Sequence, residues 1–173
     1  MIFSLFPLAN YNSIGKSRFA FGHSRLITNG SKDNQPVTTT NTYVIHNGII
    51  VNSDEIFHDE DLYRDLEIDS EIIVKLYEKY RGEGLSAIEA TDLILEKCKG
   101  TASVILMDRL RNEIILFSNN GSLYYIDDNE KLIIASEAFP LKSFQINDNI
   151  NKVPRDLSEV GPQQKQFRSS VQL

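Results

Sequence analysis

Four short apolar runs in the second half of the chain limit the possible folds more than any other feature. Polar turns separate these runs, which span residues 102–107, 113–118, 122–126 and 131–135. Two of the turns, Asn119-Asn120-Gly121 and Asp127-Asp128-Asn129, consist of residue types that tolerate the positive φ of tight hairpins. The pattern therefore predicts consecutive antiparallel strands.

The first fifty residues show less regular structure. Residues 11–42 are rich in Asn, Ser, Thr and Gly, which predicts loops around short strands. A β-branched and aromatic run at 42–46 predicts a strand. That strand is expected to stop at Asn47-Gly48, a common turn pair, and 49–51 can resume it.

Three helices are predicted between the two strand regions. Ser53 or Asp54 is placed to cap a short first helix that runs towards Tyr63. Ser86 and Glu89 form a capping-box pattern that opens the third helix.

The second helix has the clearest pattern. Asp69 is expected to be its N-cap, and Gly82 and Gly84 are expected to end it. Glu71 and Lys75 are expected to face solvent, because apolar residues at helical spacing form a separate stripe: Ile72, Ile73, Leu76, Tyr77 and Tyr80.

The order of strands, then helices, then strands indicates an α+β fold with helices packed on antiparallel sheet. A parallel α/β sheet is the alternative, and the clustered hairpins argue against it. The length of 173 residues and the hydrophobic content of 41% suit one domain with its own core. We place this domain at 21–142, between a divergent segment, 1–20, and a polar tail, 143–173, that is expected to be poorly ordered.

Charge and cysteine content exclude several kinds of function. The net charge of -6, without any Lys/Arg block, argues against binding to nucleic acid or to an anionic membrane. The single cysteine, Cys98, excludes an intrachain disulfide and fits the reducing cytoplasm. His23, His46 and His58 share no metal-ligand spacing, so no metal or cofactor is expected. The apolar start, 1–9, is too short to cross a bilayer.

Three short segments contain residues that could carry chemistry. They are Gly-His-Ser-Arg-Leu-Ile-Thr-Asn-Gly at 22–30, with Asn34-Gln35-Pro36 behind it, His-Asn-Gly-Ile-Ile-Val-Asn at 46–52, and Ile-Asp-Ser-Glu at 68–71. Taken singly, each has an ordinary explanation. Arg25 can be a surface cation, Asn47-Gly48 a tight turn and Asp69 a helix cap.

Taken together, in this order and spacing, the segments resemble the glutaminase domain of class-II glutamine amidotransferases, a branch of the N-terminal-nucleophile hydrolases. The resemblance is closest to the glutaminase half of glucosamine-6-phosphate synthase and to asparagine-synthetase-like proteins. Gly-Thr-Ala at 100–102 and Ala-Ser-Glu at 135–137 match two later landmarks of the family. The resemblance implies an αββα arrangement of layered sheets with helices. It also implies glutamine hydrolysis that supplies ammonia to an acceptor domain or subunit, such as an isomerase or a synthetase.

The resemblance assigns substrate-binding roles to four residues. L-glutamine is a zwitterion, so its recognition needs a cation for the carboxylate and an anion for the ammonium group. Arg25 matches the carboxylate clamp of the family, and Asp69 matches the residue that holds the α-ammonium. Thr28 and Asn29 match positions that line the glutamine pocket, although the glucosamine enzymes carry a histidine where Asn29 stands.

Asn47 and Gly48 match the oxyanion hole of the family. Amide hydrolysis passes through a tetrahedral oxyanion, which needs hydrogen-bond donors aimed at it. In the family the donors are the side-chain amide at the position of Asn47 and the backbone N–H at the position of Gly48. Glycine suits that second position because it lets the backbone come close.

The expected nucleophile is the point at which the sequence departs from the family. The family attacks glutamine with an N-terminal cysteine whose own α-amine takes the proton. The sequence begins Met1-Ile2-Phe3, and Cys98 lies near the end of a predicted helix, where a small buried apolar role is expected. The sequence therefore predicts an N-terminally truncated glutaminase domain without a nucleophile. The alternative is a non-catalytic module that binds glutamine or another amino acid, or that has a structural role.

Overall fold

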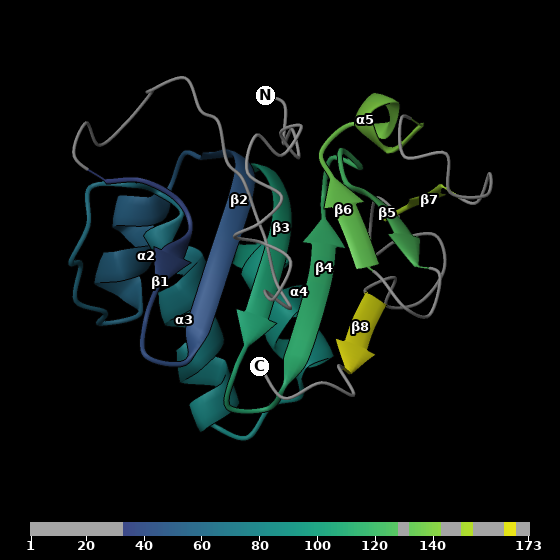
Figure 1. Ribbon diagram of the computed structural model, residues 1–173. Helices are drawn as coiled ribbons and strands as arrows, with labels where there is room; N and C mark the ends of the chain where they lie inside the picture. The colour runs from purple at the N-terminus through teal and green to yellow at the C-terminus, as the bar shows by residue number, and fades with distance from the viewer. Residues whose placement is uncertain (1–32, 128–131, 143–149, 154–164, 169–173) are drawn as a thin grey trace.

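The computed structural model describes residues 33–127, 132–142, 150–153 and 165–168 (Figure 1). Its larger sheet has the strand order β1-β2-β3-β4-β8, and every neighbouring pair is antiparallel. The strands span Val37–Thr38 (β1), Thr42–Ile50 (β2), Gly100–Asp108 (β3), Glu113–Ser118 (β4) and Lys165–Arg168 (β8). The antiparallel hairpin predicted from the two runs at 102–107 and 113–118 is confirmed.

A smaller antiparallel sheet has the order β6-β5-β7. Its strands are Tyr124–Asp127 (β5), Leu132–Ala135 (β6) and Asn151–Lys152 (β7). The β5–β6 hairpin matches the runs predicted at 122–126 and 131–135. The parallel-sheet alternative is wrong, and the α+β prediction is confirmed. Strands β7 and β8 fall within the region that the sequence predicts to have little order, and each pairs with a strand of the domain.

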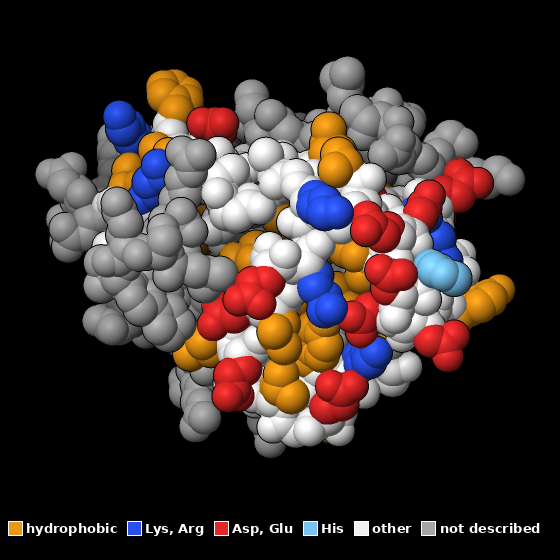
Figure 2. All heavy atoms as spheres, turned by 180° about the vertical axis from the view of Figure 1, so that it is seen from behind, with side chains coloured by type: hydrophobic (Ala, Val, Ile, Leu, Met, Phe, Trp, Pro, Cys, Tyr) orange, Lys and Arg blue, Asp and Glu red, His pale blue; other side chains and the backbone are white. Residues whose placement is uncertain are grey.

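Three helices cover one face of the larger sheet, as Figure 1 shows behind β2 and β3. They are α2 (Ser53–Asp59), α3 (Glu71–Gly82) and α4 (Ala87–Lys97). The predicted capping box is present at α4: the Ser86 side chain accepts from Glu89 N, and the Glu89 carboxylate accepts from Ser86 N. Figure 2 shows this helix layer from behind, with acidic and basic side chains interspersed around apolar atoms, so this face has no concentrated basic patch among the described residues.

The strands alternate their side chains between two cores, which produces four layers. Val44, Val104 and Leu106 pack under the helices. Ile105 and Met107 face the opposite way and pack against Tyr125 of the smaller sheet. On the outer side of that smaller sheet, Ile126 and Ala135 pack with Leu141 of α5, which spans Ala138–Lys142. The order is therefore helix, sheet, sheet, helix, in agreement with the expected αββα arrangement.

Three local predictions about strands and helices are wrong. Strand β2 does not stop at Asn47-Gly48, because both residues keep their register with β3 through Ile50. Helix α2 ends at Asp59 rather than near Tyr63, because Asp61 adopts a positive φ of 52° that stops the helix. The N-cap position of α3 is Ser70 and not Asp69, and no side chain caps that helix.

Glu71 is the fourth correction, because its side chain is buried instead of facing solvent. Its carboxylate accepts two backbone hydrogen bonds, from Asp65 N at 2.9 Å and from Leu66 N at 2.8 Å. Lys75 Nζ lies 3.7 Å from the same carboxylate. Glu71 thus fastens the loop before α3 to the first turn of that helix, and these bonds offset the cost of burying its charge.

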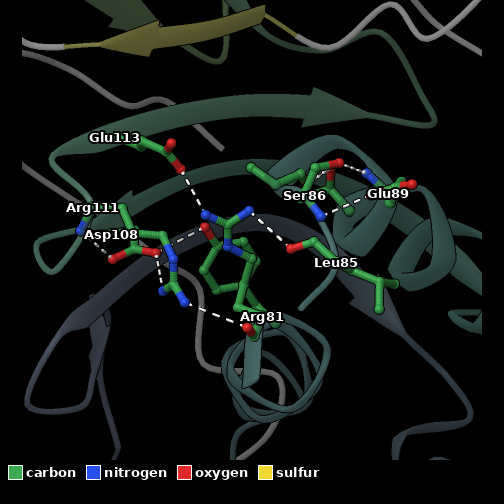
Figure 3. A network of polar contacts seen from close by, with 10 residues as sticks. Arg81, Leu85, Ser86, Glu89, Asp108, Arg111 and Glu113 are labelled. Carbon is green, nitrogen blue, oxygen red and sulfur yellow. Dashed lines mark hydrogen bonds and ion pairs between the residues drawn. The ribbon is translucent and has the colours of Figure 1, made fainter. Parts of the chain in front are cut away.

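The end of the sheet at the β3–β4 turn is held by a partly buried ion-pair network (Figure 3). Arg81 of α3 pairs with Glu113 of β4 at 3.2 Å and donates to Leu85 O at 3.1 Å. Asp108 accepts from Tyr77 Oη at 3.1 Å and from Arg111 Nη1 at 2.9 Å. Burial, followed by the Asp108 carboxylate, raises the pKa of Tyr77, so this phenol donates a hydrogen bond at neutral pH.

None of the helices in the described residues is long and apolar enough to cross a membrane.

Candidate functional site

The outer edge of β2, on the side away from β3, is the candidate site. His46 N–H donates to Gln35 Oε1 at 2.6 Å, and Gln35 Nε2 donates to His46 O at 2.8 Å. Both backbone groups of His46 therefore point away from β3. Because backbone groups alternate in direction along a strand, those of Gly48 and Ile50 point to the same outer edge.

The register with β3 supports this direction for Gly48. Its partner in β3 is Ala102, whose own backbone groups are bonded on the far side of β3. Ala102 N donates to Asn119 Oδ1 at 2.7 Å, and Asn119 N donates to Ala102 O at 2.9 Å. Gly48 and Ala102 are thus a non-hydrogen-bonded pair. The Gly48 N–H points to the outer edge of β2 and has no hydrogen-bond acceptor among the described residues.

Asp69 lies at the same edge, two residues further along β2. Its Oδ2 accepts from Ile50 N at 2.7 Å, which explains why this carboxylate does not cap α3. Among the described residues, its Oδ1 has one long contact, at 3.5 Å with Ser70 Oγ. Two residues of strand span about 6.6 Å, so the Gly48 N–H and the half-buried Asp69 carboxylate stand roughly that far apart along one edge.

Asn47 adds a second amide donor next to Gly48. Its side chain belongs to the face of β2 that carries Tyr43 and Ile45, and it is half-buried. Its side-chain amide has no hydrogen bond within the ranges that the structure describes. The structure thus places Asp69 at the outer edge of β2, two residues from Gly48, and Asn47 next to Gly48 on the same strand.

Only glycine fits at position 48. The φ of Gly48 is +153°, and a Cβ built there would lie 1.9 Å from Thr101 O and 2.6 Å from Thr101 C. These atoms are backbone of the neighbouring strand and cannot turn aside. The close approach of β2 to β3 therefore requires glycine, which is a stronger reason than the turn that the sequence suggests.

Three of the predicted substrate-binding residues, Arg25, Thr28 and Asn29, lie outside the described residues. Two residues that the sequence did not single out as site residues, Gln35 and Ser70, contact His46 behind Gly48. The presence of Asn34-Gln35-Pro36 behind the arginine segment is a signal for Gln35. Ser70 stands within the Ile-Asp-Ser-Glu segment at 68–71, which is the corresponding signal for Ser70.

Cys98 is buried behind this site and is chemically protected. Burial, followed by the nearby negative charge of Asp69, raises the pKa of the Cys98 thiol to about 12. The thiol is therefore protonated at neutral pH and is a poor nucleophile, as the sequence leads one to expect for this position.

This protection gives a simple test, because Cys98 is the only cysteine in the chain. At pH 8 we expect the folded protein to react with a thiol reagent such as DTNB about a hundredfold or more slowly than the urea-unfolded protein. The measurement is the rate of release of the coloured thiolate. Equal rates in the folded and unfolded protein would contradict the burial of this thiol.

Acidic, histidine and cysteine side chains do not gather into a metal site in the part of the chain that the structure covers. The site as described consists of hydrogen-bond donors and one carboxylate, which suit a polar organic ligand with an amide and a positive charge.

Comparison with known proteins identifies a family. A model of the glutamine amidotransferase domain matches residues 23–143. This range contains the segments at 46–52 and 68–71 and all of the segment at 22–30 except Gly22, and it contains Asn47, Gly48 and Asp69.

Two curated relatives carry the name glutamine–fructose-6-phosphate aminotransferase (isomerizing). The protein from Shouchella clausii is 30% identical over 134 residues, which cover 72% of this chain and 22% of the relative. The protein from Rhizobium meliloti is 30% identical over 129 residues, which cover 70% of this chain and 21% of the relative. The chain thus spans about a fifth of the length of these relatives.

Two solved structures share the fold. The glutamine phosphoribosylpyrophosphate amidotransferase of B. subtilis superposes with a TM-score of 0.56 at 18% identity, over 84% of this chain and 34% of that chain. A structure described as the allosteric regulatory enzyme of purine biosynthesis superposes with a TM-score of 0.52 at 18% identity, over 78% of this chain and 30% of that chain. At this identity the likeness concerns the fold.

Proposed function

The chain belongs to the glutamine amidotransferase domain family, and from that premise we propose that the outer edge of β2 binds L-glutamine. The Gly48 N–H and the Asn47 side-chain amide donate hydrogen bonds to the oxygen of the ligand's side-chain amide. The Asp69 carboxylate holds the α-ammonium group. Arg25 binds the α-carboxylate, and Thr28 and Asn29 line the pocket.

The chemistry of the site suits amide hydrolysis. When a nucleophile attacks the glutamine amide, the carbonyl oxygen becomes an oxyanion, and donors that already point at it stabilise the transition state by about 3–4 kcal/mol each. Gly48 supplies a backbone donor whose direction the strand fixes before the ligand arrives. Asp69 supplies a negative charge, which attracts the ammonium group and keeps the amide end of the ligand at Gly48.

One observation carries the proposal. Three successive backbone N–H groups of β2 point to its outer edge. The His46 N–H donates to Gln35, and the Ile50 N–H donates to Asp69. The Gly48 N–H, between them, has no acceptor in the described residues. An unsatisfied donor beside a carboxylate fits a ligand that brings both an acceptor and a positive charge.

Calorimetric titration with L-glutamine tests the proposal. We expect the purified chain to bind L-glutamine, and we expect Asp69→Asn to weaken the affinity about tenfold or more through the loss of a charge-assisted hydrogen bond. Asparagine keeps an oxygen that can accept from Ile50 N, so the fold is expected to survive. Arg25→Ala is expected to weaken binding to a similar degree.

Asp59→Asn is the matched control, because it removes an exposed carboxylate at the end of α2. This variant is expected to bind L-glutamine like the unmodified chain. Absence of heat at millimolar L-glutamine would refute the proposal. An equal loss of affinity in Asp59→Asn and Asp69→Asn would refute the role of Asp69.

For the whole protein, we propose that ammonia from glutamine passes to an acceptor domain or subunit in the cytoplasm. The two named relatives are sugar aminotransferases of which this chain spans about a fifth, which supports an acceptor of the amino-sugar type.

A non-catalytic module that binds an amino acid is the second candidate, and Cys98 is the observation that favours it. The only thiol of the 173 residues is buried and protonated, so it cannot attack a glutamine bound at the edge of β2. An ammonia-release assay with saturating L-glutamine separates the two functions. Binding without release supports the module, and release that Asn47→Ala abolishes supports hydrolysis.

A further inference from the structure

The His46 imidazole lies directly behind Gly48, on the helix-covered face of β2, and is buried. Its Nε2 is 3.2 Å from Thr101 O, and its Nδ1 is 2.9 Å from Ser70 Oγ. A carbonyl oxygen can only accept a hydrogen bond, so Nε2 carries the ring proton. Nδ1 then accepts from the Ser70 hydroxyl. One neutral tautomer satisfies both ring nitrogens.

The ring is kept neutral by its surroundings. Burial lowers the pKa of His46, and this effect exceeds the opposing effects of the Asp69 carboxylate and of the hydrogen bond to the Thr101 carbonyl. The tautomer with hydrogen on Nε2 is therefore the form present at neutral pH.

The acceptor of the Nε2–H is the carbonyl that determines the shape of the site. Thr101 O is the nearest atom to the place where a Cβ of Gly48 would stand, at 1.9 Å, and His46 Nε2 is also close, at 2.7 Å. The imidazole, the Thr101 carbonyl and the Gly48 backbone thus form one contact group. A shift of the carbonyl would change how closely Gly48 approaches β3, and with it the direction of the Gly48 N–H.

His46 is itself held from two sides. The Gln35 amide bonds to both backbone groups of His46, and Gln35 Nε2 also lies 3.4 Å from Ser70 Oγ. Ser70, at the start of α3, bonds to the ring. The segment before β1 therefore contacts the backbone of His46, while the start of α3 and strand β3 contact its ring.

We infer that His46 is a positioning residue for the oxyanion hole: through its Nε2–H it fixes the Thr101 carbonyl and so the direction of the Gly48 N–H, while Gln35 and Ser70 hold His46 in place. This inference rests on the proposed function of Gly48. His46 thus orients a donor of the site although it does not contact the ligand itself.

Two isosteric variants test the inference. In His46→Gln the side-chain Nε2 can still donate to Thr101 O, and the bond to Ser70 is lost. In His46→Asn the side chain can still reach Ser70 Oγ, and the bond to Thr101 is lost. Each variant removes one of the two ring hydrogen bonds, so a purely structural role predicts equal effects.

We expect His46→Gln to bind L-glutamine within about threefold of the unmodified chain and His46→Asn to bind it about tenfold or more weakly. In two-dimensional NMR spectra of the full chain, the Gly48 amide peak is expected to keep its position in His46→Gln and to move in His46→Asn. Equal losses in both variants, or the reverse order, would overturn the inference.

The ring tautomer provides a measurement that needs no variant. The ¹⁵N shifts of the His46 ring in the unmodified chain are expected to show a protonated Nε2 and a bare Nδ1 at pH 7. A proton on Nδ1, or on both nitrogens, would overturn the inference even if the variants do not fold. If the unmodified chain does not bind L-glutamine, the proposed function fails. The ring shifts and the Gly48 amide peak still decide whether His46 determines the direction of the Gly48 N–H.

Discussion

Replacement of Gly48 by alanine is expected to destabilise the domain by about 3 kcal/mol or more and to abolish glutamine binding. The added Cβ would stand 1.9 Å from Thr101 O, and the φ of +153° is one that side-chain-bearing residues rarely adopt. The strands β2 and β3 would have to move apart at the point where β2 presents the Gly48 N–H. Urea unfolding measures the first effect, and calorimetry with L-glutamine measures the second.

Gly82→Ala is the control for this prediction. Gly82 is the last residue of α3, its φ is not positive, and a Cβ built there meets no atom within 4 Å. Alanine favours helix over glycine, so this variant is expected to change stability by no more than about 1 kcal/mol, in the stabilising direction. A Gly48→Ala protein as stable as the Gly82→Ala protein would show that the strands do not approach as closely as described.

Local patterns in the sequence predicted much of the fold. The hairpins follow from turns of Asn, Asp and Gly, whose effect is confined to a few residues. The capping box of Ser86 and Glu89 was predicted for the same reason, since both partners lie within one helical turn. Element order then leads to the α+β class, because antiparallel hairpins leave one sheet face for helices to cover.

Two of the predictions that failed depend on partners far away in the chain, and a third depends on a loop that folds back over the start of a helix. Asp69 looks like a cap, yet its carboxylate bonds to Ile50 N, 19 residues earlier. Asn47-Gly48 looks like a turn, yet Gly48 is needed because Thr101 of another strand comes close. Glu71 looks exposed, yet it is buried under the loop that it binds. No local pattern reveals such contacts.

The same limit applies to the candidate site. Asn47, Gly48 and Asp69 were selected through the family resemblance, and that resemblance does not say how they face one another. The outward direction of the Gly48 N–H emerges only from the register of β2 with β3 and from the bonds of its neighbours. Gln35 and Ser70 stand within segments that the sequence singles out, but their contacts with His46 follow from the fold and not from the spacing of the motifs.

Replacement of Glu113 by glutamine is expected to cost about 3 kcal/mol of the free energy of unfolding. Glu113 and Arg81 retain only 9% and 10% of their side-chain exposure, and they join β4 to the end of α3 (Figure 3). Glutamine has nearly the same shape as glutamate, so the change removes the charge and little packing. The Arg81 guanidinium then loses its ion-pair partner while it stays buried, and its Nε already has no hydrogen-bond partner among the described residues.

Two further variants separate the charge effect from other causes, with urea unfolding as the measurement. Glu55→Gln breaks an exposed pair with Lys99, whose side chains are 57% and 67% exposed, and it is expected to change stability by less than about 1 kcal/mol. The double variant Arg81→Met with Glu113→Leu removes both charges, and it is expected to recover most of the stability lost in Glu113→Gln, because no unpaired charge stays buried. A double variant less stable than Glu113→Gln would show that the ion pair contributes net stability. The stability lost in Glu113→Gln would then come from the lost attraction between the two side chains and not from a buried, unpaired guanidinium.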